Sequence, residues 1–170
     1  MGSFPLKRLR GVVYDMAHLN DFRFQVPADG SSYWVGVKFT CHCFTKKLEA
    51  YHSPELLYEH EGEKRAFDVQ RYELSKFLPA YIRSLVGSSV YWSNKGSFFF
   101  WRTPNGVSYL VFFTALQASK GNVKVRIKIG SAYPKSGSQF ASPVDFAELM
   151  KMKAAGEFPE LGPKVQITRK

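Results

Sequence analysis

The clearest chemical pattern in the sequence lies in residues 123–132, where cationic and aliphatic residues alternate. Lys124, Arg126 and Lys128 are separated by single aliphatic residues. Side chains two residues apart share one face of a β-strand, so we expect the three cations in a row, ~6.6 Å apart. This spacing is close to the phosphate repeat along a nucleic-acid strand and favours phosphate binding. Cations that guard an exposed edge strand against aggregation would give the same pattern.

The distribution of charge supports an anionic partner. The chain has 170 residues, 24 basic and 14 acidic, with a net charge of +10. No acid occurs in the 71 residues between Glu73 and Asp145, whereas this stretch holds nine bases, including Lys95 and Arg102. A solvated surface usually mixes both signs of charge, so an acid-free stretch favours a polyanion. We expect nucleic acid in preference to an acidic membrane or protein.

His42 is the candidate for proton transfer, because histidine titrates near neutral pH. Residues 33–44 alternate in polarity, which predicts a strand with its apolar set, including Cys41 and Cys43, facing the core. His42 is then expected on the opposite, more polar face beside Thr40 and Lys38. A histidine with a purely structural role is the alternative.

The Cys41-His42-Cys43 sequence also suggests a zinc site that His52 or His60 would complete. In a strand, however, both cysteines point away from His42, so we expect no metal and no other cofactor. The cysteines are then free thiols in the core, consistent with a reducing cytoplasm. No run of ~18 apolar residues occurs, so we expect no membrane partner.

Further residues, among them Lys95, are predicted to contact a substrate. Thr114 is a candidate to position the phosphate from a pocket, but its position on a strand with two apolar faces favours a core threonine bonded to the backbone. Trp101 is a candidate for stacking on bases within the aromatic residues 97–102. Ser131 and Tyr133 follow the cationic row and are expected to position the phosphate.

The elements that must position these residues indicate an α+β fold with a largely antiparallel sheet. N-terminal strands precede one main helix at residues 71–85, which contains Pro79. Four strands then form a meander through short turns, one of them containing Asn105-Gly106. Their expected ranges are 90–92, 97–102, 107–116 and 123–132.

The C-terminal part is predicted to be a loop at residues 135–138 followed by a closing helix at 145–155. Ser142 is expected to cap this helix, with Pro143 at its first position. The tail, residues 156–170, is expected to be peripheral. We predict a single domain over residues 1–170, made of N-terminal strands and a loop (11–69), the helix and meander (70–134), and the C-terminal loop, helix and tail (135–170).

Three patches resemble a family of uncharacterised bacterial and mobile-element proteins. They are residues 39–45 (FTCHCFT), Phe67-Asp68 with residues 71–75 (RYELS), and residues 111–114 (VFFT) with 131–134 (SAYP). The helix and meander of residues 70–134 also look like the barnase/EndoU/RelE-like toxin ribonucleases. That resemblance implies metal-free RNA cleavage by side chains on the sheet, although the meander itself contains no histidine.

We therefore predict a cytoplasmic RNA-binding protein that acts as a metal-independent endoribonuclease of toxin type. His42, Lys128 and Arg102 are the expected catalytic residues, and the ribose 2′-OH is the nucleophile, which requires RNA and not DNA. The acid-free stretch lacks the carboxylates of a two-metal nuclease. The alternatives are a non-catalytic nucleic-acid-binding module and a regulatory protein that docks an acidic inhibitor or antitoxin.

Overall fold

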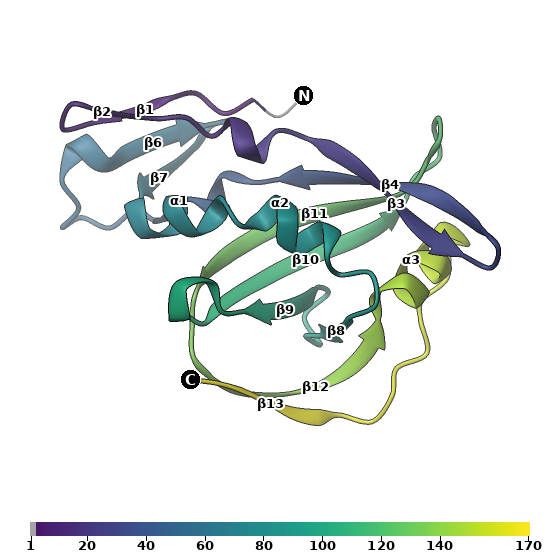
Figure 1. The fold of residues 1–170 in the computed structure, drawn as a ribbon. Helices are drawn as coiled ribbons and strands as arrows, with labels where there is room; N and C mark the ends of the chain where they lie inside the picture. The colour runs from purple at the N-terminus through teal and green to yellow at the C-terminus, as the bar shows by residue number, and fades with distance from the viewer. Residues whose placement is uncertain (1–2) are drawn as a thin grey trace.

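The computed structural model describes residues 3–170, in which thirteen strands form three sheets and three α-helices pack against them (Figure 1). Residues 1 and 2 of the predicted domain lie outside the described residues. The strands are Lys7–Leu9 (β1), Val12–Tyr14 (β2), Phe22–Ala28 (β3), Ser31–Phe39 (β4), Thr45–Lys47 (β5), Leu57–His60 (β6), Glu63–Phe67 (β7), Ser89–Trp92 (β8), Phe98–Arg102 (β9), Tyr109–Gln117 (β10), Val123–Pro134 (β11), Gly137–Asp145 (β12) and Val165–Arg169 (β13). The α-helices are Val69–Ser75 (α1), Leu78–Arg83 (α2) and Phe146–Ala154 (α3). This arrangement confirms the predicted α+β class.

The largest sheet has the strand order β13-β12-β8-β9-β10-β11-β4-β3. The predicted meander is confirmed, because β8, β9, β10 and β11 pair antiparallel in sequence order. Strand β4 pairs parallel to β11 on its other side. Strand β11 is therefore central, and the interpretation of its cations as protection of an edge strand is wrong.

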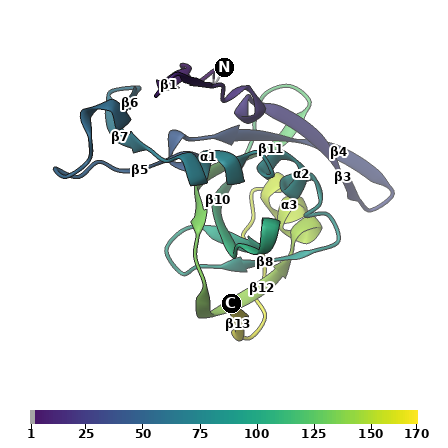
Figure 2. The same ribbon diagram turned by 60° about the vertical axis from the view of Figure 1, so that its left-hand side comes forward.

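A second sheet, β5-β7-β6, follows the end of β4. In both views it lies across the molecule from β12 and β13 (Figure 1, Figure 2). A two-stranded hairpin, β1-β2, lies close to it, and Lys7 donates hydrogen bonds to the carbonyls of Glu55 and Leu57. The short connection of residues 40–44 joins β4 to β5 and keeps the small sheet beside the end of β4, where the candidate site is found.

The single helix predicted at residues 71–85 is in fact two short helices, α1 and α2. Asp68 caps α1 by accepting a hydrogen bond from the Arg71 amide, and α1 ends at Ser75. Pro79 lies in the first turn of α2. Proline has no amide hydrogen, so it interrupts a continuous helix but fits a first turn, where that hydrogen would have no partner.

The prediction for the C-terminal part was wrong in three respects. Of residues 135–138, which were expected to form a loop, Gly137 and Ser138 already belong to the long strand β12. Pro143 lies within β12, in the part of the strand that pairs with β8 but not with β13. Proline has no amide hydrogen to donate, and on the side of β12 without a partner strand none is needed. Helix α3 is capped by Asp145, which accepts from the Glu148 amide, and not by Ser142. The tail is not peripheral either, because β13 pairs with β12.

The core lies on the face of the sheet that the helices cover. Val125, Ile127 and Ile129 of β11 are buried there in one cluster with residues of the helices, such as Leu78 of α2 and Phe146 of α3. A smaller cluster lies elsewhere on the sheet and consists of Phe99, Trp101, Leu110, Ala141 and Ile167. The two clusters bury both faces of β9, which leaves its aromatic side chains no solvent-exposed face.

Candidate active site

The cationic row on β11 is exposed, as the alternation predicts. Lys124, Arg126 and Lys128 are solvent-exposed, while the residues between them are buried. The parallel partner strand adds Lys38, which lies in register with Lys128. The same strand places Gly36 beside Arg126. The cations of two adjacent central strands therefore share one open face.

This face is hollowed between β3, β4, β11 and the end of β10. The hollow, called hollow 1 below, has a volume of about 450 Å³ and is lined by Asp21, Phe22, Arg23, Gly36, Val37, Lys38, Thr114, Leu116, Val123, Arg126, Ile127 and Lys128. A Cβ on Gly36 would lie 3.3 Å from Val123 Cγ1 and 3.6 Å from Arg126 Nη1. The missing side chain therefore leaves room for Arg126 over β4. Thr114 also lines this hollow.

The predicted strand at residues 33–44 ends earlier, at Phe39, and residues Cys41–Cys43 form a 3₁₀ turn. Thr40 causes this change in direction. Its hydroxyl accepts a hydrogen bond from the His42 amide at 3.3 Å and donates one to the Gly130 carbonyl at 2.9 Å. The expectation that His42 points away from both cysteines is therefore wrong, because it assumed an extended backbone.

The turn is held against β11 at the position that follows Lys128. The Thr40 amide donates to the Ile129 carbonyl at 3.1 Å, and the Cys43 thiol donates to the same carbonyl at 3.8 Å. On its other side, the Thr45 hydroxyl donates to the Cys41 carbonyl at 2.6 Å. These contacts bring the Cys41–Cys43 turn to the end of the cationic row.

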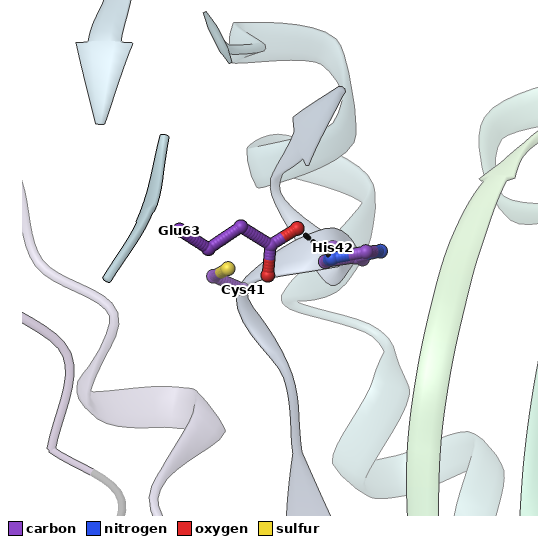
Figure 3. Close-up of side chains that lie close together, drawn as sticks. All are labelled: Cys41, His42 and Glu63. Carbon is purple, nitrogen blue, oxygen red and sulfur yellow. Dashed lines mark hydrogen bonds and ion pairs between the residues drawn. The ribbon is translucent and has the colours of Figure 1, made fainter. Parts of the chain in front are cut away.

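His42 is hydrogen-bonded to Glu63, the first residue of β7. The distance between His42 Nε2 and Glu63 Oε1 is 2.6 Å (Figure 3). Arg65 lies 3.4 Å from the same oxygen. Partial burial of the carboxyl raises the pKa of Glu63, but the hydrogen bonds and charges of His42 and Arg65 outweigh it and the pKa is lowered overall. A neutral His42 that donates from Nε2 keeps a free lone pair on Nδ1, so it can accept a proton there.

The His42–Glu63 pair lies in a second hollow, called hollow 2, of about 350 Å³. It is lined by Phe4, Lys38, Phe39, Thr40, Cys41, His42, His60, Glu61, Glu63, Lys128 and Gly130. Lys38 and Lys128 line both hollows. The cationic face and the His42–Glu63 pair are therefore adjoining parts of one site.

Ser131 and Tyr133 lie farther along β11, beyond the bulge that separates Ile129 from Ser131 in the pairing with β10. The Arg71 guanidinium lies 5.2 Å from the centre of the Tyr133 ring. Ser131 and Tyr133 line neither hollow. They extend the same strand but lie outside the site around His42.

The structure does not bring Arg102 to the other predicted catalytic residues. Arg102 pairs with Tyr109, and Tyr109 pairs with Pro134, which is six residues beyond Lys128 on β11. That separation corresponds to ~20 Å along a strand. Arg102 is half-buried against the Phe100 ring, and burial together with the charge of Arg169 lowers its pKa. Arg102 therefore lies outside the candidate site.

Trp101 and Lys95 are also separate from the site. Trp101 is only 2% exposed, and its indole N–H donates to the Lys135 carbonyl at 3.1 Å, so it has no free face for a base. Lys95 lies in the exposed turn between β8 and β9 and lines neither hollow.

Three residues of hollow 2, namely Lys38, His60 and Glu63, were not predicted as site residues. The alternation of residues 33–44 places Lys38 on the same polar face as Thr40, and this signal identifies it. Nothing in the local sequence marks Glu63, which pairs with His42 across 21 residues and comes from another sheet. His60 ends β6 in that same sheet.

The same turn brings potential metal ligands together. Ligand atoms of Cys41, His42 and Glu63 all lie within 4.8 Å of one another. The expected absence of a metal at Cys41-His42-Cys43 assumes an extended strand, whereas the strand ends at Phe39 and these residues form a turn. In residues 3–170, no helix is both long and apolar enough to cross a membrane.

Comparisons with known proteins place the chain in a bacterial family. A model of the YjaZ family matches residues 5–154, which include all three patches of the expected family resemblance. Protein YjaZ of Escherichia coli strain K12 is 32% identical over 119 residues, or 67% of this chain and 65% of that protein. The chain thus matches just under two thirds of that relative's length. No solved structure matched significantly. With most of its length matched by the family model, the chain belongs to the YjaZ family.

Proposed function

We propose that this protein binds RNA on the cationic face of β4 and β11 and cleaves it without a metal at the His42–Glu63 pair. One observation carries the proposal: Lys38 and Lys128 line both hollows. An RNA strand that follows the cations of hollow 1 would therefore place a phosphate beside His42.

The binding part rests on the arrangement of charge. Lys124, Arg126 and Lys128 are exposed at alternate positions, ~6.6 Å apart along β11. Arg23 adds a guanidinium stacked on the Trp34 ring at 4.5 Å on the neighbouring strands. Such cations contribute affinity by neutralising phosphates and releasing counterions, whatever the base sequence.

The cleavage part follows from the groups in hollow 2. His42 takes the proton of a ribose 2′-OH, whose oxygen attacks the adjacent phosphorus, and Glu63 stabilises the resulting imidazolium. Lys38 and Lys128 stabilise the negative charge that develops on the phosphorane. The bond to the 5′-oxygen then breaks, and that oxygen receives a proton from an acid. His60 lines the same hollow and is the candidate acid. The products are a 2′,3′-cyclic phosphate and a 5′-hydroxyl.

A non-catalytic RNA-binding module is the second candidate function. It is favoured by the geometry of hollow 1, which presents Arg23, Lys38, Arg126 and Lys128 without any need for His42. Binding that depends on salt but leaves the RNA intact would select this function. We also propose that an acidic inhibitor protein can bind the same cations. The proposed place of action is the cytoplasm.

The experiment is incubation of total RNA with the protein in EDTA. We expect cleavage by the wild-type protein and a loss of about 100-fold or more in rate for His42→Ala, as for removal of a general base. His52→Ala is the matched control, because His52 accepts a hydrogen bond from the Glu49 amide and does not line hollow 2. Absence of cleavage by the wild type, or equal cleavage by His42→Ala, would refute the catalytic proposal.

A further inference from the structure

Three side chains with different ligand atoms converge beside hollow 2. Cys41 and His42 come from the 3₁₀ turn after β4, and Glu63 comes from the start of β7. Figure 3 shows the Glu63 carboxylate close to both the Cys41 sulfur and the His42 ring. The ligand atoms of all three lie within 4.8 Å of one another.

The chemistry of this set is selective. A thiolate sulfur, an imidazole nitrogen and a carboxylate oxygen are all zinc ligands, whereas Mg²⁺ and Ca²⁺ prefer oxygen alone. Zinc–ligand bonds of 2.0–2.3 Å place tetrahedral ligand atoms roughly 3.3–3.7 Å apart. The present separations, from 2.6 Å for His42–Glu63 up to 4.8 Å, differ from this by about an ångström.

Local structure permits that adjustment without a change of fold. The side chains of His42 and Glu63 are 33% and 47% exposed, so both can rotate. The backbone beneath them is held by the pairing of Thr45 with Phe67, which joins β5 to β7. Cys41 is buried, and its carbonyl is fixed by the Thr45 hydroxyl.

We propose that Cys41, His42 and Glu63 form a zinc-binding site with its fourth position open toward hollow 2. Three protein ligands are the usual number where a metal keeps an exchangeable position for water or another small ligand. Lys38 and Lys128 line the same hollow and favour an anion, such as a phosphate oxygen, at that position. Binding releases the Cys41 thiol proton to solvent as the S–Zn bond forms.

Occupation of this site would replace the hydrogen bond between His42 and Glu63 with bonds to the metal. If the proposed ribonuclease activity holds, zinc then inhibits it, because His42 can no longer act with Glu63 in proton transfer. The inhibition rests on the proposed function, whereas the binding of zinc does not.

The test uses Co²⁺ as the probe, because Co²⁺ takes the place of zinc and shows thiolate ligation by absorption. The full-length protein is reduced with a phosphine, freed of EDTA and titrated with Co²⁺. We expect one ion per chain, a sulfur-to-cobalt charge-transfer band, and displacement of the Co²⁺ by Zn²⁺ in accordance with the order of metal affinities.

Two variants, Cys41→Ser and Cys43→Ser, identify the ligand. The Cys43 thiol donates to the Ile129 carbonyl and is fully buried, so Cys43→Ser should keep the charge-transfer band. Cys41→Ser should lose the band and bind Co²⁺ more weakly, by on the order of tenfold or more. Even the removal of a residue that only hydrogen-bonds to a metal ligand weakens binding by about this much. Circular dichroism verifies that both variants fold.

A folded wild-type protein without the band, or a band that persists unchanged in Cys41→Ser, would overturn the metal site. Protein that binds Co²⁺ through Cys41 but cleaves no RNA in EDTA supports the site and removes only the ribonuclease proposal. Cleavage in EDTA without any Co²⁺ binding leaves the ribonuclease proposal intact and refutes the zinc site.

Discussion

The dependence of RNA binding on salt tests the cationic face quantitatively. The perturbation is Lys128→Gln, which removes one charge at the point where hollows 1 and 2 meet. Lys128 is exposed, and the β11 backbone is held by pairing on both sides, so the variant should fold normally. Lys95→Gln is the matched control, since Lys95 is an exposed lysine in a turn away from both hollows.

The expected magnitude follows from the number of cations on the face. If Lys38, Lys124, Arg126 and Lys128 each neutralise one phosphate of a single strand, the slope of log K against log salt is about −2.8. The affinity of the wild-type protein then falls about 50-fold between about 50 and 200 mM salt. For Lys128→Gln the slope becomes about −2.1 and the fall about 20-fold.

Fluorescence anisotropy with a labelled RNA oligonucleotide measures these slopes. The RNA should carry 2′-O-methyl groups throughout, so that binding is recorded without cleavage. We expect Lys95→Gln to keep the slope of the wild-type protein. An unchanged slope for Lys128→Gln, or an equal decrease for both variants, would refute the assignment of the face.

Three further predictions concern the turn and its surroundings. Added Zn²⁺ should suppress RNA cleavage by the wild-type protein and by Cys43→Ser but much less by Cys41→Ser, as measured by initial rates on a fluorogenic RNA. Thr45→Val should lower the free energy of unfolding in urea by about 1–3 kcal/mol, because the buried hydroxyl bonds the Cys41 carbonyl and the Arg65 guanidinium. Glu63 has a lowered pKa, so its ionised form stabilises the folded protein above its ordinary pKa of 4.5, and this stability is lost as the pH falls through the lower folded-state value. Glu63→Gln should therefore lose less thermal stability than the wild type between pH 6 and pH 3.

Each of these outcomes has a clear opposite. Equal zinc inhibition of both cysteine variants would place the inhibiting ion elsewhere. A Thr45→Val protein as stable as the wild type would show that the turn does not depend on that hydroxyl. Identical losses of stability at low pH for Glu63→Gln and the wild type would mean that the carboxyl of Glu63 gains nothing from His42 and Arg65.

Local sequence patterns were sufficient to predict those strands that pair with the next strand in the sequence. The alternation at residues 123–132 was sufficient to place Lys124, Arg126 and Lys128 on one face, because a strand has a strict two-residue period. The meander was predictable for a similar reason, since short turns force consecutive strands to pair.

The remainder depends on contacts between distant segments. The end of β4 at Phe39 depends on Thr40, whose hydroxyl bonds Gly130 at a distance of 90 residues in sequence. Without that turn, neither the His42–Glu63 pair nor the approach of Cys41 to it can be foreseen. Pro143 was misread because Ser-Pro is also a typical helix start, and only the pairing of β12 distinguishes the two.

The most direct test of the central claim is the cleavage of a short defined RNA in EDTA, compared with the same RNA carrying a single 2′-O-methyl group at the cleaved position. We predict a 2′,3′-cyclic phosphate on the upstream fragment of the unmodified RNA, complete protection of the modified bond, and no product with His42→Ala. Cleavage of the modified bond, a linear phosphate formed without a cyclic precursor, or equal product with His42→Ala would contradict the account.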